Sequence, residues 1–375
     1  MLFHYSCHPF TIFLTIFQRM PIVPLYGHHA LRSRLLQVIA QGRLPATILL
    51  HGHPGIGKQR LALWLAQALL CERDDRPCGV CHPCRYALEL KHPDLYWFYP
   101  RPRLKDHDPG SADVLEDYME STMDRVSRRG LYPHPPGTDG LYIATIRTIV
   151  QRASLAPAMG HRKVFIVGDA ERMVSQEGAD QAANAFLKLL EEPPANTTIV
   201  LTSSEPGALL PTIRSRVVAF RCAPLGEAET RAFLSDLQVQ EALAALDVPL
   251  ETEARIVVAG GSPGRLFWGE ALDTARLAAR QMVAAADRGG EAVYATALAQ
   301  GASSARGAFS ETLDALQRLL RERTRDAIAR GDMDGASGAS RAIDAVLRAQ
   351  ERAEGNVNPQ LVTAQLLREL ALVLS

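Results

Sequence analysis

The segment Gly52–Gln59, which reads GHPGIGKQ, carries the strongest chemical pattern in this chain. It fits G-x-x-x-x-G-K, in which Gly52, Gly55 and Gly57 let successive backbone N–H groups face a phosphate and Lys58 reaches the outer phosphates. The apolar run ILL before the loop predicts a buried strand. The apolar residues after it recur at the spacing of one helix face: Leu61, Trp64, Leu65, Ala68 and Leu69. Strand, glycine loop and helix predict a nucleotide-binding P-loop, and the alternative is a loop kept only for its turn geometry.

Two positions depart from what an ATPase needs. Gln59 replaces the Ser or Thr whose hydroxyl normally holds Mg²⁺, and its amide oxygen has the wrong reach. The second strand, Val164–Val167, runs into Asp169, which we expect to hold Mg²⁺ through water. Ala170 stands where a water-polarising Glu is usual, and on a continuing strand Glu171 would point to the opposite face. Both losses together predict that the chain does not hydrolyse ATP, while binding of ATP or ADP without turnover stays open.

Four of the six cysteines crowd into one short segment at the spacing C-x6-C-x2-C-x2-C: Cys71, Cys78, Cys81 and Cys84. Thiolates at this density suit a closed tetrahedral Zn²⁺ site. Such a site is structural and contributes about 10–16 kcal/mol of apparent binding free energy to local folding. The alternative is four reduced thiols in a loop.

A third apolar run, Thr198–Leu201, is followed by a proline turn and then by Ser215-Arg216-Val217. An arginine at the edge of a P-loop domain can reach the γ-phosphate held by a neighbouring subunit, an arrangement worth about 10³–10⁵ in rate. By itself the Ser-Arg pair is no signal, because most such arginines are solvated. Its position after the strand and turn makes Arg216 a candidate arginine finger.

The length and composition indicate a multidomain protein with no strong charge of its own. A chain of 375 residues exceeds one hydrophobic core, and its 41 basic side chains match its 41 acidic ones, which excludes a basic genome-coating protein. No apolar run is long enough to span a bilayer, and the short run Thr11–Phe17 lacks a secretory cleavage site. We therefore expect residues 1–19 to be a mis-called leader or disordered, with translation from Met20, and the chain to be cytoplasmic with reduced cysteines.

The elements that must position these residues fall into three parts. Apolar strands separated by helical patterns predict a parallel sheet with helices on both faces in residues 20–222. Within it, the polar and proline-punctuated stretch 100–140 is expected to be a surface insertion with one helix in Ala112–Arg128. Residues 223–271 predict a small helical domain. Residues 272–375 predict a bundle of helices with apolar faces, two of them separated by the glycine-rich break Gly331–Gly338.

Several stretches together resemble one family. They are GHPGIGKQ, the four cysteines directly after its helix, VFIVGDAERM, AFLKLLEEPP with TTIVLTSSEPGALLPTIRSRV, GGSPGRL and, in residues 356–361, NVNPQL. The set resembles the clamp-loader branch of the AAA+ proteins and, within it, the delta-prime subunits of bacterial DNA polymerase III. The resemblance covers most of Pro21–Ser375 and excludes the leader and the insertion.

The resemblance implies an α/β P-loop (AAA+) domain with a parallel sheet, a small helical lid and an all-α C-terminal collar that joins subunits. It implies a stator of the DNA polymerase III holoenzyme that helps to place a sliding clamp on primed DNA, rather than an ATPase in its own right. The implied partners are gamma/tau and delta subunits in a hetero-pentamer, the sliding clamp, and primer-template DNA through the assembly, with no membrane.

The resemblance also assigns roles to single residues. Arg216 corresponds to the arginine finger offered to the adjacent subunit, although Val217 stands where the motif usually has Cys. Thr202 corresponds to the sensor after the third strand, and Arg265 to the sensor in GSPGR. Gln59 and Ala170 depart from the gamma/tau pattern and favour the delta-prime type.

Two rival functions are open. An ATP-hydrolysing gamma/tau-type motor subunit would need Ser or Thr at position 59 and Glu at position 170. A small-molecule P-loop kinase would leave the cysteine cluster, Arg216 and the helical C-terminal third without a role.

Overall fold

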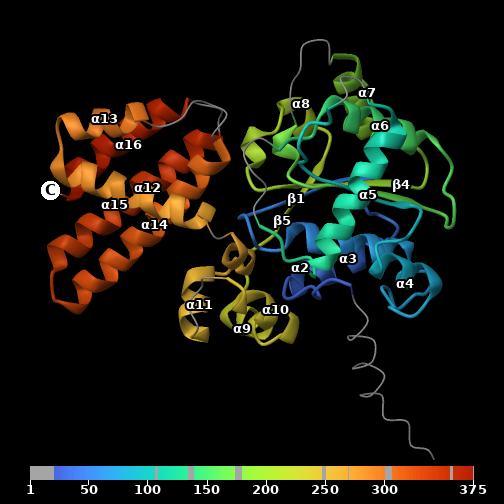
Figure 1. Ribbon diagram of the computed structural model, residues 1–375, viewed down its shortest axis with the longest axis horizontal. Coiled ribbons are helices and arrows are strands. Elements are labelled where there is room, and N and C mark those ends of the chain that lie inside the picture. Colours follow the sequence, from blue (N-terminus) through green and yellow to red (C-terminus); the bar gives the residue numbers. More distant parts are fainter. Residues whose placement is uncertain are drawn as a thin grey trace, which may run out of the picture. The chain divides into compact units, whose positions relative to one another are not determined.

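The structure, a computed structural model, describes residues 21–105, 109–133, 139–173, 180–246, 251–268, 270–299, 306–354 and 358–374. Its contacts divide the chain into two units (Figure 1). The first holds the described residues of Met1–Pro133, Asp139–Ser204 and Pro211–Phe267, and the second those of Glu205–Leu210 and Trp268–Ser375. The expected leader, residues 1–19, lies outside the described residues.

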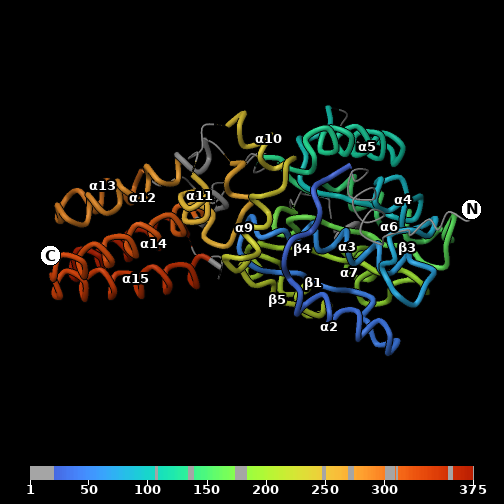
Figure 2. The backbone as a smooth tube through the Cα atoms, turned by 90° about the horizontal axis from the view of Figure 1, so that it is seen from below, coloured from blue at the N-terminus to red at the C-terminus, as the bar shows by residue number. Residues whose placement is uncertain are grey.

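The first unit is built on a parallel sheet, as the sequence predicts. Its strand order is β2-β3-β4-β1-β5, and every neighbouring pair is parallel (Figures 1 and 2). The strands are β1 (Thr47–His51), β2 (Leu95–Phe98), β3 (Lys163–Val167), β4 (Thr197–Ser203) and β5 (Val218–Arg221). Successive residues of β3 and β4 are all buried, so both faces of the central sheet are covered. The predicted runs correspond to β1, β3 and β4, whereas β2 and β5 were not predicted.

The P-loop helix α3 (Lys58–Leu70) differs from the amphipathic helix expected. All of its residues except Arg60 are buried, not one face alone. It packs on β1, β3 and β4 and is covered by α2 (His29–Ala40) and α4 (His82–Leu88). A helix enclosed from all sides in this way gains no solvated face, which explains why its polar residues need partners inside the protein.

The described part of the stretch 100–140, expected to be a surface insertion, packs against the first unit along one side of its helix. Its helix α5 (Ser111–Ser127) forms as predicted, but it buries Val114, Tyr118 and Arg125. The Tyr118 hydroxyl donates to the backbone oxygen of Tyr99 (2.7 Å), just after β2. Helix α5 packs on α6 (Ile143–Ser154), and α6 packs on α7 (Asp180–Glu191). The charged residues of α5 lie mainly on its exposed side, while one side of the helix packs against the unit.

Short helices complete the first unit. After β4 come α8 (Pro211–Arg214) and, beyond β5, α9 (Glu227–Leu234), α10 (Leu237–Ala244), α11 (Thr252–Ala259) and the 3₁₀ turn η3 (Pro263–Phe267). Val23 joins the hydrophobic cluster of these last helices, which includes Phe233, Leu243 and Leu266. This small helical region is counted with the sheet in one unit.

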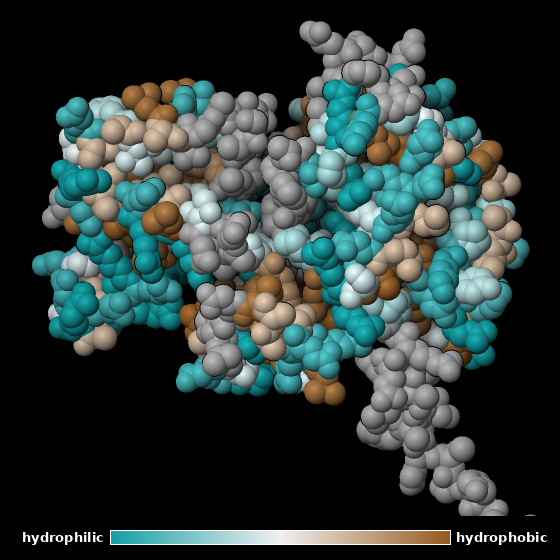
Figure 3. All heavy atoms as spheres, in the orientation of Figure 1, coloured by the Kyte–Doolittle hydropathy of each residue, from teal (hydrophilic) through white to brown (hydrophobic). Residues whose placement is uncertain are grey.

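The second unit is a helical bundle. Its helices are α12 (Glu270–Arg288), α13 (Glu291–Ala299), α14 (Arg306–Ala329), α15 (Met333–Glu354) and α16 (Pro359–Leu374). One continuous core, with Phe309, Leu316 and Leu367 fully enclosed, joins α12 to α16. Hydrophilic residues cover much of the face shown in Figure 3. Of the NVNPQL stretch, residues 356 and 357 lie outside the described residues, and Asn358 accepts from the backbone N–H of Gln360 (2.9 Å) at the start of α16.

The glycine-rich break between two of these helices is shorter than predicted. Helix α14 ends at Ala329 and α15 begins at Met333, so Gly335 and Gly338 lie inside a helix. A Cβ atom at Gly338 would lie 2.5 Å from the backbone oxygen of Val373 on α16. Gly338 is thus a packing glycine that lets two helices approach, not a turn residue. Among the described residues, no helix combines the length and hydrophobicity needed to cross a membrane.

We expect Gly338→Ala to lower the free energy of unfolding by about 1–2 kcal/mol, because overpacking outweighs the gain in helix propensity. Gly335→Ala is the matched control, since the nearest atoms there belong to the end of the Asp332 side chain, whose movement costs at most its hydrogen bond from Gly335 N–H (2.9 Å). Denaturant unfolding of the full chain measures both. A Gly338→Ala protein as stable as the control would contradict the close approach of α15 and α16.

Candidate functional site

The sheet order gathers the candidate nucleotide-binding residues at one edge. Because β4 lies between β1 and β3, the loop Gly52–Gly57 after β1, Asp169 after β3 and Ser204 after β4 meet at the carboxyl ends of the strands. Gly55 and Gly57 have φ angles of 80° and 91°, a conformation that favours glycine. The loop therefore has the P-loop geometry that the sequence predicts.

Lys58 lies inside this edge with all three of its protons engaged. It is 5% exposed, and its Nζ donates to Gly52 O (3.0 Å), His53 O (3.0 Å) and Ser204 Oγ (2.8 Å). Burial lowers the pKa of Lys58, while the carboxylates of Asp169 and Glu171 oppose that change. Ser204 was not predicted as a site residue, although it follows Thr202 at the end of the third apolar run.

Gln59 is buried, and both ends of its amide bond to protein groups. Its Nε2 donates to Asp169 Oδ2 (3.1 Å). Its Oε1 accepts from Trp97 Nε1 (3.0 Å), Arg125 Nη1 (3.2 Å) and the Tyr132 hydroxyl (3.4 Å). The amide oxygen thus points toward three donors, and its N–H group points toward the carboxylate expected to bind the metal. None of these three donors was predicted from the sequence.

The expectation that Glu171 points away from the site is wrong. Asp169 adopts a left-handed conformation with φ 47°, and the 3₁₀ turn η1 (Ala170–Arg172) follows, so the alternation of a strand no longer applies. Glu171 Oε1 accepts from the backbone N–H of Ser204 (2.8 Å), whereas its Oε2 has no hydrogen-bond partner among the described residues. Burial and the neighbouring Asp169 raise the pKa of Glu171 to about 7.

The two predicted sensor residues lie in the same region. Thr202 is fully buried, and its hydroxyl accepts from the backbone N–H of Asp169 (3.1 Å), the residue that follows β3 at the site. Arg265 is 6% exposed, and its charge lies close enough to Lys58 to lower the pKa of that lysine. The structure therefore brings Thr202 and Arg265 to the P-loop.

The turn before Arg265 rests directly on the P-loop. Gly264 N donates to Gly55 O (2.9 Å), and a Cβ atom at position 264 would lie 2.9 Å from Gly55 Cα. On the N-terminal side, His28 Nε2 lies 2.8 Å from Ile56 O. Backbone and side-chain contacts thus hold the loop from two directions.

Arg216 lies apart from these residues, on the connection between α8 and β5. Its guanidinium bonds to Glu191 Oε2 (3.2 Å) and Thr212 O (2.9 Å), and its side chain is 29% exposed. Its own backbone oxygen accepts from Thr47 Oγ1 on β1 (2.8 Å). Among the described residues, its hydrogen bonds include none to the P-loop. The structure therefore leaves Arg216 partly open to solvent and away from its own nucleotide site.

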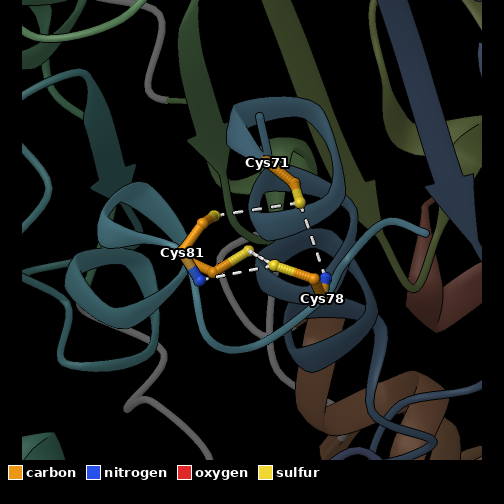
Figure 4. A group of neighbouring side chains, drawn as sticks. Cys71, Cys78 and Cys81 are labelled. Carbon is orange, nitrogen blue, oxygen red and sulfur yellow. Dashed lines mark hydrogen bonds between the residues drawn. The ribbon is translucent and has the colours of Figure 1, made fainter. Parts of the chain in front are cut away.

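The four clustered cysteines converge between α3 and α4. The Sγ atoms of Cys71, Cys78, Cys81 and Cys84 all lie within 4.8 Å of one another, and Figure 4 shows the labelled thiols facing a common centre. The Sγ atoms of Cys81 and Cys71 are 3.9 Å apart, close to the edge of about 3.8 Å expected of a tetrahedron with Zn–S bonds of about 2.3 Å. Backbone N–H groups of Cys78 and Cys81 point to sulfur atoms (3.5 and 3.4 Å). The geometry fits a closed four-thiolate zinc site.

Comparison with known proteins points to one family. The family model described as "DNA polymerase III, delta subunit" matches residues 27–226. A DNA polymerase III subunit delta' of Pseudomonas aeruginosa is 33% identical over 217 residues, 57% of this chain and 52% of that protein. The Escherichia coli delta' subunit is 28% identical over 243 residues, 64% of this chain and 59% of that one.

A gamma/tau subunit is similar to a comparable degree. That of Mycobacterium bovis is 31% identical over 241 residues, which is 63% of this chain and 34% of that protein. The chain thus spans between 34% and 59% of the length of these three relatives. Since the family model covers more than half of it, the chain belongs to the family of DNA polymerase III delta subunits.

Proposed function

We propose that this chain is a delta-prime-like clamp-loader subunit of DNA polymerase III, which helps to place a sliding clamp on primed DNA without hydrolysing ATP itself. Its contribution to ATP chemistry is Arg216, offered to the nucleotide of a neighbouring subunit. The proposal rests on the family, on the disabled P-loop and on the place of Arg216. The gamma/tau-type motor is the second candidate, because gamma/tau relatives are similar to a comparable degree.

The main support for this proposal is that the amide oxygen of Gln59 already accepts hydrogen bonds from protein groups. An ATPase needs an oxygen ligand for Mg²⁺ at this position, and here the amide oxygen is taken by Trp97, Arg125 and Tyr132. Ala170 supplies no carboxylate for the attacking water. Glu171 lies near Lys58, and its Oε1 accepts from the backbone N–H of Ser204, so only Oε2 is left without a partner among the described residues. These features support a subunit that does not turn over ATP.

The helical bundle supports assembly with other subunits. Large apolar side chains are exposed on neighbouring α13 and α16: Tyr294 (55%), Leu298 (74%) and Leu361 (66%). Hydrophobic residues also gather over α13 in Figure 3. An exposed apolar group of this kind marks an interaction surface. In the proposed function it contacts the collar helices of gamma/tau and delta subunits.

Zinc is the proposed structural cofactor. Burial raises the pKa of the Cys84 thiol above its ordinary value, and a divalent cation offsets the cost of holding four thiolates together. The ion would be held by Cys71, Cys78, Cys81 and Cys84 and would fix the start of α4 against the end of α3.

We expect the purified chain to contain one zinc per molecule and Cys81→Ser to lose most of it, because three thiolates leave the site open to water. Elemental analysis of protein prepared without chelator measures the content. Cys222→Ser is the matched control, as Cys222 is buried outside the cluster. Less than half an equivalent of zinc in the unchanged protein would contradict the site.

We expect the isolated chain to hydrolyse ATP no faster than its Lys58→Ala variant, because Gln59 and Ala170 remove a metal ligand and the water-polarising carboxylate. Steady-state phosphate release at saturating ATP measures this. Turnover that disappears in Lys58→Ala would move the chain to the gamma/tau class.

Arg216→Ala should leave folding, zinc content and assembly unchanged, because its ion pair with the 59% exposed Glu191 is worth little. The DNA-stimulated ATPase of the assembly reconstituted with gamma/tau and delta should fall by the share of one interface, since losing a finger arginine costs about 10³–10⁵ in rate there. Other interfaces keep their own arginines, so the fall is partial.

Arg214→Ala is the control for this experiment, because Arg214 is an exposed arginine two residues earlier on α8. An assembled Arg216→Ala complex with unchanged ATPase and clamp-loading rates would leave Arg216 as a solvated surface charge.

A further inference from the structure

The buried guanidinium of Arg125 contacts Gln59, next to the place where a P-loop protein holds its metal ion. Arg125 comes from α5, a helix that carries none of the nucleotide-binding motifs. Arg125 of α5 is 7% exposed. Its guanidinium carbon lies 3.2 Å from the ring centre of Tyr99, 3.9 Å from that of Tyr132 and 4.8 Å from that of Trp97. A charge taken out of water is costly unless it is compensated, and three aromatic rings supply part of that compensation.

Gln59 connects this cation to the carboxylate of the site. Arg125 Nη1 donates to Gln59 Oε1 (3.2 Å), and Gln59 Nε2 donates to Asp169 Oδ2 (3.1 Å). The amide dipole thus has its negative end at the guanidinium and its positive end at the carboxylate. Guanidinium, amide and carboxylate form one neutral chain across the place where a P-loop protein holds its metal.

The Gln59 amide lies directly against the backbone of Gly168. A Cβ atom at position 168 would lie 2.6 Å from Cδ and Nε2 of Gln59. Any side chain there would collide with the Gln59 amide, so the two residues are a matched pair. The Gln59 amide thus occupies the space that a side chain at position 168 would need, and position 59 offers no hydroxyl.

The residues present therefore do not fit Mg²⁺. That ion needs oxygen ligands in near-octahedral array at about 2.0–2.1 Å. Here Asp169 Oδ2 is bonded to an amide N–H, and the amide oxygen already accepts from Trp97, Arg125 and Tyr132.

We propose that the Arg125 guanidinium takes the place of the magnesium ion and prevents the P-loop from binding Mg²⁺-nucleotide. It acts through the Gln59 amide, which fits beside Asp169 because Gly168 has no side chain. This inference rests on the proposal that the chain does not hydrolyse ATP, and it names the residues that keep the site closed. It also gives α5 a role: the helix delivers the cation. Under the competing explanation, Arg125 only anchors α5, and the amide contact is incidental.

The experiment titrates a fluorescent ATP analogue into the isolated full chain, with MgCl₂ and separately with EDTA. In the unchanged protein we expect affinity to differ less than twofold between the two conditions, or no binding in either. A tenfold or greater gain from Mg²⁺ would overturn the proposal. This measurement needs no variant and no partner subunit, so its failure leaves the clamp-loader role and the Arg216 test standing.

The second arm combines three changes in one chain: Gln59→Thr returns a hydroxyl to position 59, Gly168→Asp adds a carboxylate in the space that the amide leaves, and Arg125→Met removes the cation. We expect this protein to bind the analogue at least tenfold more tightly with Mg²⁺ than with EDTA. The control replaces Arg125→Met by Arg128→Met in the same background, because Arg128 directly follows α5 and pairs with Asp124 at an exposed position. A triple variant that keeps its zinc and its cooperative unfolding but shows no Mg²⁺ dependence would refute the replacement.

A double-mutant cycle of thermal stability tests the contact between positions 59 and 168 even if the triple variant folds poorly. Gly168→Asp alone should lower Tm, because the new side chain collides with Gln59. Adding Gln59→Thr should recover at least half of that loss. Losses that simply add would show that positions 59 and 168 are independent and would sink the proposal.

Discussion

A buried side-chain amide must find partners for both of its ends, and in this protein the Gln59 amide finds them on four separate elements. Trp97 comes from β2, Arg125 from α5, Tyr132 from the segment after α5, and Asp169 from the end of β3. Leaving one such group unsatisfied costs about 1–3 kcal/mol. The same contacts that fill the P-loop therefore tie α5 and the sheet edge to the P-loop helix.

The residues of the P-loop stabilise the fold, whereas the residue proposed to act on ATP lies elsewhere in the domain. Lys58, which in an ATPase binds phosphate, donates hydrogen bonds to Gly52, His53 and Ser204. The backbone N–H of Gly264 donates to the oxygen of Gly55 in the loop. Arg216, in contrast, is partly exposed on a segment fixed to β1 by Thr47. In the proposed function, this partly exposed arginine acts on the nucleotide of a neighbouring subunit.

The strands that are continuous apolar runs, and the cluster formed by regularly spaced cysteines, could be predicted from the sequence. The apolar runs gave β1, β3 and β4 and hence the parallel sheet, and the cysteine spacing gave a cluster whose sulfur atoms do converge. Arg125 could not be found in this way, because one buried arginine on a helix rich in acidic residues looks like any solvated charge. The aromatic run YWFY before the insertion was the available signal. Strand β5 was missed because three of its four residues are exposed.

Anomalous diffraction tests most directly whether a metal ion can bind beside Asp169. Crystals of the unchanged chain would be grown with Mn²⁺ and a non-hydrolysable ATP analogue, and data collected at the manganese edge. Because Arg125 takes the place of the ion, we expect no anomalous peak beside Asp169 and the Gln59 amide still between Asp169 and Arg125. A manganese peak at that place, with the Gln59 side chain displaced, would contradict it.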